Sequence, residues 1–299
     1  MATYTEPMRP YEFVLSDHGG ISYESATLNS GSGTLVPGSV IGRITKRQAA
    51  APIPTIVGTG TGAMTLLTFG PDVQVGSYVI TLTATSATAA FTVTAPDGTA
   101  LPTGNVATAY KSNHLSFLIG NAGTMTTGDA FTVVVTAGGT PVLVGTGSGV
   151  VSAFSLGPLA QRGTYRVKLT ATSATALFEV RAPSGELVGT GNVATAFASD
   201  HVNFSLANGG TMTLGDYFNI IVAGYTTPEA LLWDPTAVNG VNEVFGIATH
   251  GAAASGTVAV LTRLAEVKTA ALTWKSTVTA AQKTEAYRQM AANNLIVRS

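Results

Sequence analysis

The sequence contains no cysteine, and this absence limits the chemistry that the chain can carry. Without thiols there is neither a disulfide framework nor a thiolate metal site. Charge is also scarce, because Asp, Glu, Lys and Arg make up 10% of the residues, against about 25% in ordinary soluble domains. The formal net charge is −1, with no basic block or stripe. A nucleic-acid binder is therefore not expected, since such proteins carry a concentrated positive surface.

Long apolar runs are missing as well. No stretch approaches the roughly 20 apolar residues that span a bilayer. The N-terminal region carries Glu6, Arg9, Glu12 and Asp17 and has no apolar run. A secretory signal peptide needs such a run. We therefore expect a soluble protein that is not exported through an N-terminal signal.

What the sequence does have is an internal duplication. Residues 54–140 are followed directly by a second copy at 141–227, and 44 of the 87 aligned positions are identical. The flanking segments, 1–53 and 228–299, resemble neither copy. The simplest interpretation is one small domain, built from the two flanks and here called the framework, that is interrupted by two tandem domains. Any function has to be considered separately for the framework and for the repeats.

Both copies have the pattern of antiparallel β-structure. In the second copy, apolar Tyr165, Val167 and Leu169 alternate with polar residues, and Phe178 and Val180 do so after a turn. A period of two predicts half-buried antiparallel strands. Further strands are expected at 56–57, 64–69, 115–119 and 131–136, and at the positions 87 residues later. Short strands at this spacing favour two immunoglobulin-like β-sandwiches.

The hairpin in the second copy also predicts a strand register. Symmetry about residues 171–176 places Lys168 opposite Glu179 and Arg166 opposite Arg181. The equivalent residues of the first copy are Val79, Thr81, Thr92 and Thr94. We therefore expect the two domains to share a core and to differ in their surfaces.

The flanks predict a small, mostly β framework with one C-terminal helix. Residues 241–248 and 256–261 are strand-like. Thr279 and Gln282 have the spacing of a capping box, in which each side chain bonds to the backbone of the other at a helix start. Apolar residues then recur at helical spacing until Asn293, where the helix is expected to end.

Several framework segments resemble the lambda-like phage head decoration proteins. In chain order these segments are residues 13–16, 19–20, 28–33, 34–45, 233–235, 244–247, 270–274, 279–283 and 294–298. The resemblance covers about 1–50 and 230–299, on both sides of the duplicated insert. Short members of that family lack the insert.

The resemblance implies a structural virion protein, made in the host cytoplasm. It implies a homotrimer that contacts the major capsid protein on the outer surface of the expanded head. In that family a flexible N-terminal arm takes part in the contact, and residues 1–11 fit such an arm by composition. The residues expected to contact the capsid or the trimer partners are Tyr11, Phe13, Trp274, Tyr287 and Met290.

No pattern in the sequence predicts catalysis, a cofactor or a metal. Residues 58–62 and 145–149 are glycine-rich, but a β-like run follows each, whereas a phosphate loop leads into a helix. His114 and His201 occupy equivalent positions without a partner at ligand spacing, so solvent-facing histidines are expected. Asp129 and Asp216 follow glycines and are interpreted as turn caps. We therefore expect no enzyme.

A second function stays open for the repeats. Displayed on a capsid, they could act as an adhesion module that binds host-cell glycans. The loops of a sandwich cluster at its ends and suit recognition, and many copies per head would add avidity. Against this, the outward faces are rich in Thr, Ser and Ala and show no aromatic cluster. A free-standing adhesin is less consistent with the framework motifs.

Overall fold

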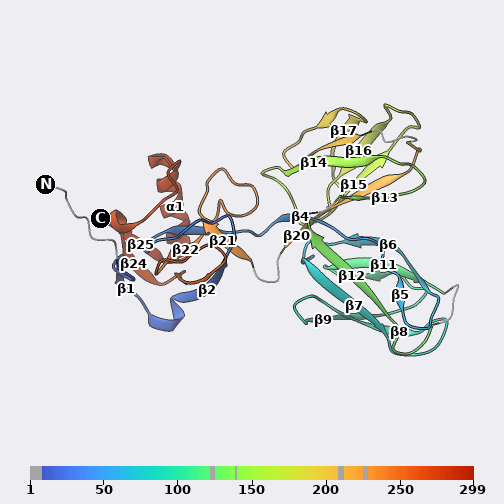
Figure 1. Cartoon of the computed structure of the whole chain (residues 1–299), viewed down its shortest axis with the longest axis horizontal. Helices are drawn as coiled ribbons and strands as arrows, with labels where there is room; N and C mark the ends of the chain where they lie inside the picture. Colours follow the sequence, from blue (N-terminus) through green and yellow to red (C-terminus); the bar gives the residue numbers. More distant parts are fainter. Residues whose placement is uncertain (1–8, 122–124, 139, 208–211, 225–227) are drawn as a thin grey trace. The chain divides into compact units, whose positions relative to one another are not determined.

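The computed structural model describes residues 9–121, 125–138, 140–207, 212–224 and 228–299 (Figure 1). The chain divides into two compact units. One comprises Met1–Thr45 with Thr227–Ser299, and the other is Lys46–Thr226. We call them the framework unit and the repeat unit. Strands dominate both, and the described residues contain a single α-helix near the C-terminus. The prediction of a mainly β protein with one C-terminal helix is confirmed.

The framework unit is built around a closed five-stranded barrel in the order β2-β21-β3-β22-β23. Its strands are β2 (Tyr23–Leu28), β3 (Val40–Arg43), β21 (Glu229–Leu232), β22 (Val244–Ala248) and β23 (Thr257–Leu261). The first two precede the repeats in the sequence and the other three follow them. In Figure 1 the blue and the orange-red parts of the chain therefore interleave in one barrel.

The repeat unit is inserted between two paired strands of this barrel. β3 and β21 are antiparallel, with Arg43 opposite Ala230. The backbone N–H of Ile44 then donates to the carbonyl of Glu229 at 2.8 Å. Two antiparallel strands can be joined by a short turn. The insert therefore takes the place of a hairpin connection, which explains how the barrel tolerates it.

A three-stranded sheet and the helix complete the framework unit. The sheet has the order β1-β24-β25, and β25 is parallel to β24. Its strands are β1 (Val14–Ser16), β24 (Ala265–Lys268) and β25 (Leu295–Arg298), and short 3-10 turns lie at η1 (Gly19–Ile21) and η2 (Thr269–Ala271). Residues 241–243, which were expected to start a strand, form a turn instead, because Glu243 N–H bonds back to the carbonyl of Gly240 at 3.0 Å.

Helix α1 (Ala280–Ala292) has the predicted ends. The hydroxyl of Thr279 accepts the N–H of Gln282 at 3.4 Å, and the Gln282 side chain accepts the N–H of Thr279 at 2.9 Å. Asn293 is the C-cap residue of the helix, and Asn294 adopts a left-handed backbone with φ of 56°. The capping box predicted from the sequence is confirmed.

Each copy in the repeat unit supplies eight strands at equivalent positions. The first copy has β5 (Ile56–Val57), β6 (Ala63–Phe69), β7 (Gly76–Leu82), β8 (Ala90–Thr94), β9 (Ala100–Asn105), β10 (Tyr110–Lys111), β11 (Leu115–Gly120) and β12 (Ala130–Ala137). The second has β13 (Val142–Val144), β14 (Val150–Leu156), β15 (Gly163–Leu169), β16 (Leu177–Arg181), β17 (Leu187–Asn192), β18 (Ala196–Phe197), β19 (Val202–Ala207) and β20 (Tyr217–Ala223). Two sheets enclose the core of each copy. Phe91 and Phe117 meet in the first core at 5.6 Å between ring centroids, and Phe178 and Phe204 meet in the second at 5.7 Å.

Strand β4 (Arg47–Ala50) links the two copies. Ala50 pairs with Thr136 of β12, and Ala49 pairs with Ile221 of β20. The larger sheets of both copies therefore merge through β4 into one sheet of 11 strands. Residues up to 53 were expected to belong to the framework, whereas the repeat unit starts at Lys46 because of this pairing.

Candidate functional site

The five residues expected to contact the capsid or the trimer partners all lie in the framework unit, in different environments. Phe13 and Met290 have 0% of their surface exposed and belong to the unit's core. Trp274 and Tyr287 are partly buried against the same core. Tyr11 is 48% exposed. As folded here, the chain leaves Tyr11, Trp274 and Tyr287 within reach of a partner and holds Phe13 and Met290 inside.

Trp274 and Tyr287 lie together with Trp233, which was not among the expected contact residues. The rings of Trp233 and Trp274 meet edge-to-face at 5.8 Å, and those of Trp274 and Tyr287 at 5.7 Å. Such edge-to-face pairs stabilise a cluster beyond the area they bury. Burial raises the pKa of the Tyr287 phenol. Trp233 is 1% exposed and therefore anchors the cluster from inside.

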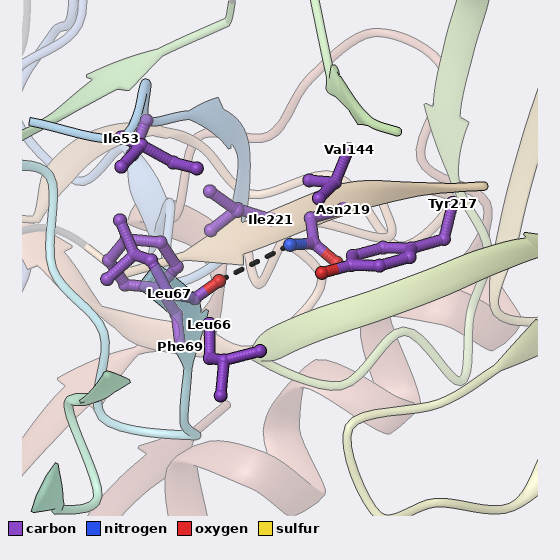
Figure 2. Close-up of a pocket in the computed structure, with 9 residues that line it drawn as sticks. Ile53, Leu66, Leu67, Phe69, Val144, Tyr217, Asn219 and Ile221 are labelled. Atoms are coloured by element: carbon purple, nitrogen blue, oxygen red, sulfur yellow. Dashed lines mark hydrogen bonds between the residues drawn. The ribbon is translucent and has the colours of Figure 1, made fainter. Parts of the chain in front are cut away.

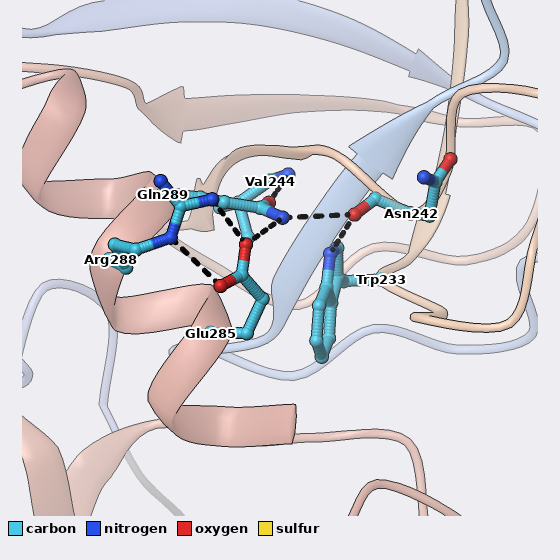
Figure 3. A network of polar contacts seen from close by, with 6 residues as sticks. All are labelled: Trp233, Asn242, Val244, Glu285, Arg288 and Gln289. Carbon is cyan, nitrogen blue, oxygen red and sulfur yellow. Dashed lines mark hydrogen bonds and ion pairs between the residues drawn. The ribbon is translucent and has the colours of Figure 1, made fainter. Parts of the chain in front are cut away.

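A polar network joins α1 to the start of β22 (Figure 3). The side-chain carbonyl of Gln289 accepts the N–H of Val244 at 2.7 Å. The amide nitrogen of Gln289 and the indole N–H of Trp233 both donate to the carbonyl of Asn242, at 3.4 and 2.9 Å. The aromatic cluster and the helix are therefore positioned through the same turn.

The outer end of this network is an exposed ion pair. Arg288 donates two hydrogen bonds to the carboxylate of Glu285, at 2.8 and 2.6 Å (Figure 3). These bonds, with another from Gln289, lower the pKa of Glu285 to about 2. Both groups face solvent, and exposed pairs stabilise little. The pair therefore holds the two side chains against each other on the surface of α1 and adds little to the stability of the fold.

Several apolar side chains of the framework unit remain exposed. They are Tyr11, Leu15, Ile21, Val36, Leu264 and Ile296, with exposures from 37% to 63%. Leu15 and Ile296 lie on the two outer strands of the sheet β1-β24-β25. The hydroxyl of Ser22 donates to the carbonyl of Leu264 at 3.2 Å, which places the turn at Ile21 close by. Contiguous exposed apolar residues are typical of an interaction surface, and these residues are candidates for one.

The two equivalent histidines of the repeat unit were expected to face solvent, but each is half-buried beside a tyrosine. Nδ1 of His114 lies 3.1 Å from the hydroxyl of Tyr78, and Nδ1 of His201 lies at the same distance from Tyr165. Each tyrosine oxygen also accepts a backbone N–H, and both histidines are half-buried. Among the described residues, no group of three or more His, Asp or Glu side chains is placed to hold a metal.

Asp129 and Asp216, which occupy equivalent positions in the two copies, bond to residues farther away along the chain than a turn cap would. The carboxylate of Asp129 accepts the N–H of Thr59 at 3.0 Å and of Gly60 at 2.7 Å, about 70 residues earlier in the chain. Asp216 accepts the N–H of Gly147 in the same way, at 2.7 Å. The glycine-rich loops therefore present their N–H groups to a carboxylate of the same chain, and not to a phosphate.

The junction between the two copies contains a small apolar cavity of about 30 Å³. Figure 2 shows Leu67 and Phe69 of the first copy facing Tyr217 and Asn219 of the second. The side-chain N–H of Asn219 donates to the carbonyl of Leu67 at 3.3 Å. This volume holds about one or two water molecules. The cavity is a packing feature of the junction and is too small for an organic ligand.

Comparison with known protein families identifies the chain. It matches the family described as Bacteriophage lambda head decoration protein D over residues 3–295, which includes both segments of the framework barrel. The chain belongs to this head decoration family. The resemblance inferred from the framework motifs is confirmed. Neither the comparison with curated proteins nor that with solved structures found a match.

Membership of this family assigns a structural role in the phage capsid and a location on the virion head. The exposed framework residues are therefore candidate contacts with other head proteins. No helix in the described part of the decoration protein has the length and apolar character that a membrane span requires.

Proposed function

We propose that this decoration protein binds as a homotrimer to the outer surface of the expanded phage head, where it contacts the major capsid protein and stabilises the shell. The observation that carries the proposal is the family match across both framework segments. A protein that binds the assembled shell and not its free subunits stabilises the assembly by mass action. Several contacts per trimer increase the effect.

The exposed apolar residues of the framework unit support a contact surface there. Leu15 is 48% exposed on β1, in the sheet that contains the C-terminal strand β25, and Ile21 is 63% exposed in η1. Burying such side chains in a partner is favourable. Tyr11 is 48% exposed and is a further candidate for this contact. The N-terminal arm proposed for residues 1–11 lies mostly outside the described residues, which begin at residue 9.

The proposal is tested by mixing the purified protein with expanded heads that carry no decoration. We expect saturable binding at local threefold positions, seen by electron cryomicroscopy, and a trimer by light scattering in solution. Ile21→Asp should weaken head binding by at least about tenfold, because a buried, unpaired carboxylate is costly. Leu187→Asp places the same change on an exposed leucine of the repeat unit and should leave binding unchanged. Absence of binding to expanded heads would refute the proposal.

We further propose that the repeats are immunoglobulin-like domains displayed outward, and that adhesion to host-cell glycans is their alternative role. The hairpin geometry at Ile44 and Glu229 supports a clean deletion, with residues 46–226 replaced by a short turn. If adhesion is their role, heads decorated with the shortened protein stay stable but attach less to host cells. Unchanged attachment would leave the repeats as a passive spacer.

A further inference from the structure

A hollow of about 250 Å³ on the repeat unit is lined by positive charge. Thr68 of the first copy and Thr164, Arg166 and Arg181 of the second contribute to its wall. Arg166 and Arg181 are direct partners across β15 and β16, as the hairpin register predicted. Like charges that face each other across two strands oppose the pairing. Glu179 offsets the charge of Arg181 through an ion pair, and the charge of Arg166 is the one left to be offset.

The fold does not require these arginines. The first copy places Val79 and Thr94 at the equivalent positions of the same hairpin, which is also formed there. The cores of the two copies are alike, with Tyr78 and Tyr165 fully buried at matching sites. The positive charge is thus a property of the second copy's surface and is separate from the folding pattern that both copies share.

Arg181 is held in a fixed orientation. Its Nε and Nη2 donate to the two carboxylate oxygens of Glu179, at 3.2 and 3.3 Å, and its Nη1 donates to the carbonyl of Gly185 at 3.1 Å. A guanidinium group has five N–H groups in a rigid plane. Two of them therefore remain available beside the hollow.

Arg166 is positioned without being neutralised. Its guanidinium carbon lies 4.6 Å from the centre of the Tyr217 ring, which favours a stacked orientation. Within the part of the chain that the structure describes, no hydrogen bond or ion pair is formed by its side chain. Its N–H groups, which are exposed to solvent, are free to bind an external acceptor.

We propose that this hollow binds an oxyanion, either a carboxylate or a phosphate group, carried by an acidic ligand. One guanidinium group is held by Glu179 and the other lies over the ring of Tyr217. Carboxylate and phosphate oxygens accept hydrogen bonds from the planar N–H groups of such side chains. Thr68, which carries a hydroxyl, also lines the hollow. The carboxylate of Glu179 already offsets the charge of Arg181, so the bound anion offsets the charge of Arg166, which has no ion pair among the described residues. Every residue involved lies in the repeat unit, so the inference does not depend on the proposed head binding.

The test is a titration of the purified full-length protein, followed by amide chemical shifts at constant ionic strength. Sodium glucuronate and inorganic phosphate are the two probes, and glucose is the uncharged counterpart. We expect saturable shifts around Arg166 and Arg181 with at least one anion and none with glucose. The anion that binds identifies the source of the oxyanion as a carboxylate or a phosphate.

Two variants that each remove one positive charge distinguish a specific anion site from general electrostatic attraction. Arg166→Val installs the residue of the first copy and should weaken anion binding by at least about tenfold. Lys168→Thr also installs the residue of the first copy, two positions along the same strand face, but Lys168 does not line the hollow. This control should change the affinity by less than about twofold.

Two results would overturn the proposal. One is the absence of saturation with both anions, and the other is equal weakening by Lys168→Thr and Arg166→Val. If Arg166→Val does not fold, Arg166→Gln takes its place, because it keeps a polar side chain of similar reach and removes only the charge and the fork. Wild-type affinity in a folded Arg166→Gln protein would likewise refute the site.

Discussion

The carboxylate of Asp129 accepts the backbone N–H of Gly60 at 2.7 Å, and in the second copy Asp216 and Gly147 have the same relationship. The neighbouring Gly58 has φ of +139°, and a Cβ placed there would lie 1.9 Å from an oxygen of Asp129. The loop before β6 therefore needs glycine, both for its backbone conformation and for the space that the carboxylate occupies. One acidic side chain thus anchors the entry into each copy.

Replacing Asp129 should destabilise the repeat unit. Asp129→Ala leaves the N–H groups of Thr59 and Gly60 without their acceptor, and we expect the free energy of unfolding to fall by about 2–4 kcal/mol. Urea denaturation followed by circular dichroism measures the change. Asp200→Ala is the control, because Asp200 is exposed, and it should change stability by less than about 0.5 kcal/mol. Equal effects of the two substitutions would contradict the anchoring role.

A buried hydroxyl contributes one hydrogen bond to the junction between the copies. Thr164 Oγ1 accepts the N–H of Phe69 at 2.7 Å, so Thr164→Val should cost about 1–3 kcal/mol by leaving that N–H unsatisfied. Ser77 holds the equivalent position in the first copy but is exposed, so Ser77→Ala should be nearly neutral. Thermal unfolding of both variants tests this. A Thr164→Val protein as stable as the wild type would show that the junction does not need this bond.

Alkaline pH should weaken the repeat unit through its buried phenols. Burial raises the pKa of Tyr78 to about 12, from an ordinary value of 10.0, and also raises that of Tyr165. The stabilising contribution of neutral Tyr78 is therefore complete below pH 10 and is lost as the pH rises through 12. We expect it to reach about 2–3 kcal/mol. Unfolding free energies measured from pH 9 to 12 should decline less steeply in Tyr78→Phe, and identical slopes would contradict the assignment.

The network that positions α1 should depend on Gln289 more than on the exposed ion pair. Gln289→Leu removes the acceptor of the Val244 N–H, which should lower the stability of the framework unit by about 1–3 kcal/mol. Arg288→Ala breaks only the surface pair with Glu285 and should cost less than about 0.5 kcal/mol. Near-ultraviolet circular dichroism of the tryptophans reports on the framework unit, which contains Trp233 and Trp274. The reverse order of the two losses would count against the network.

Local patterns predicted much of the secondary structure. The alternation in the second copy predicted both strands of the hairpin and the pairing of Arg166 with Arg181, and the structure has this register. It did not predict that Glu179 would form its ion pair with Arg181, on the same strand, although Lys168 lies opposite. Backbone pattern determines which residues are opposite each other, whereas the choice among nearby cations depends on side-chain reach.

For the candidate contact residues too, the sequence pattern left part of the outcome to the tertiary structure. Aromatic and long apolar residues can serve either as interior packing or as contact surface, and sequence spacing does not separate the two. Phe13 and Met290 became core because strands β1 and β24 and helix α1 close around them. Tyr11 remained exposed. The expectation that these residues contact the capsid or a trimer partner stays a prediction.

By itself, the sequence determined the duplication, the strand and helix pattern, the helix cap at Thr279 and the framework motifs of the family, because these depend on residues close together in the chain or on an ordered series of motifs. Only the tertiary structure decided how β4 joins both copies, which loop Asp129 holds, and that Arg166 and Arg181 share a hollow with Thr68. Apart from the hairpin pair Arg166 and Arg181, whose register the alternation predicted, those contacts join residues about 70 to 170 positions apart. Local periodicity carries no information about such pairs, because they form only when the sheets close on their cores.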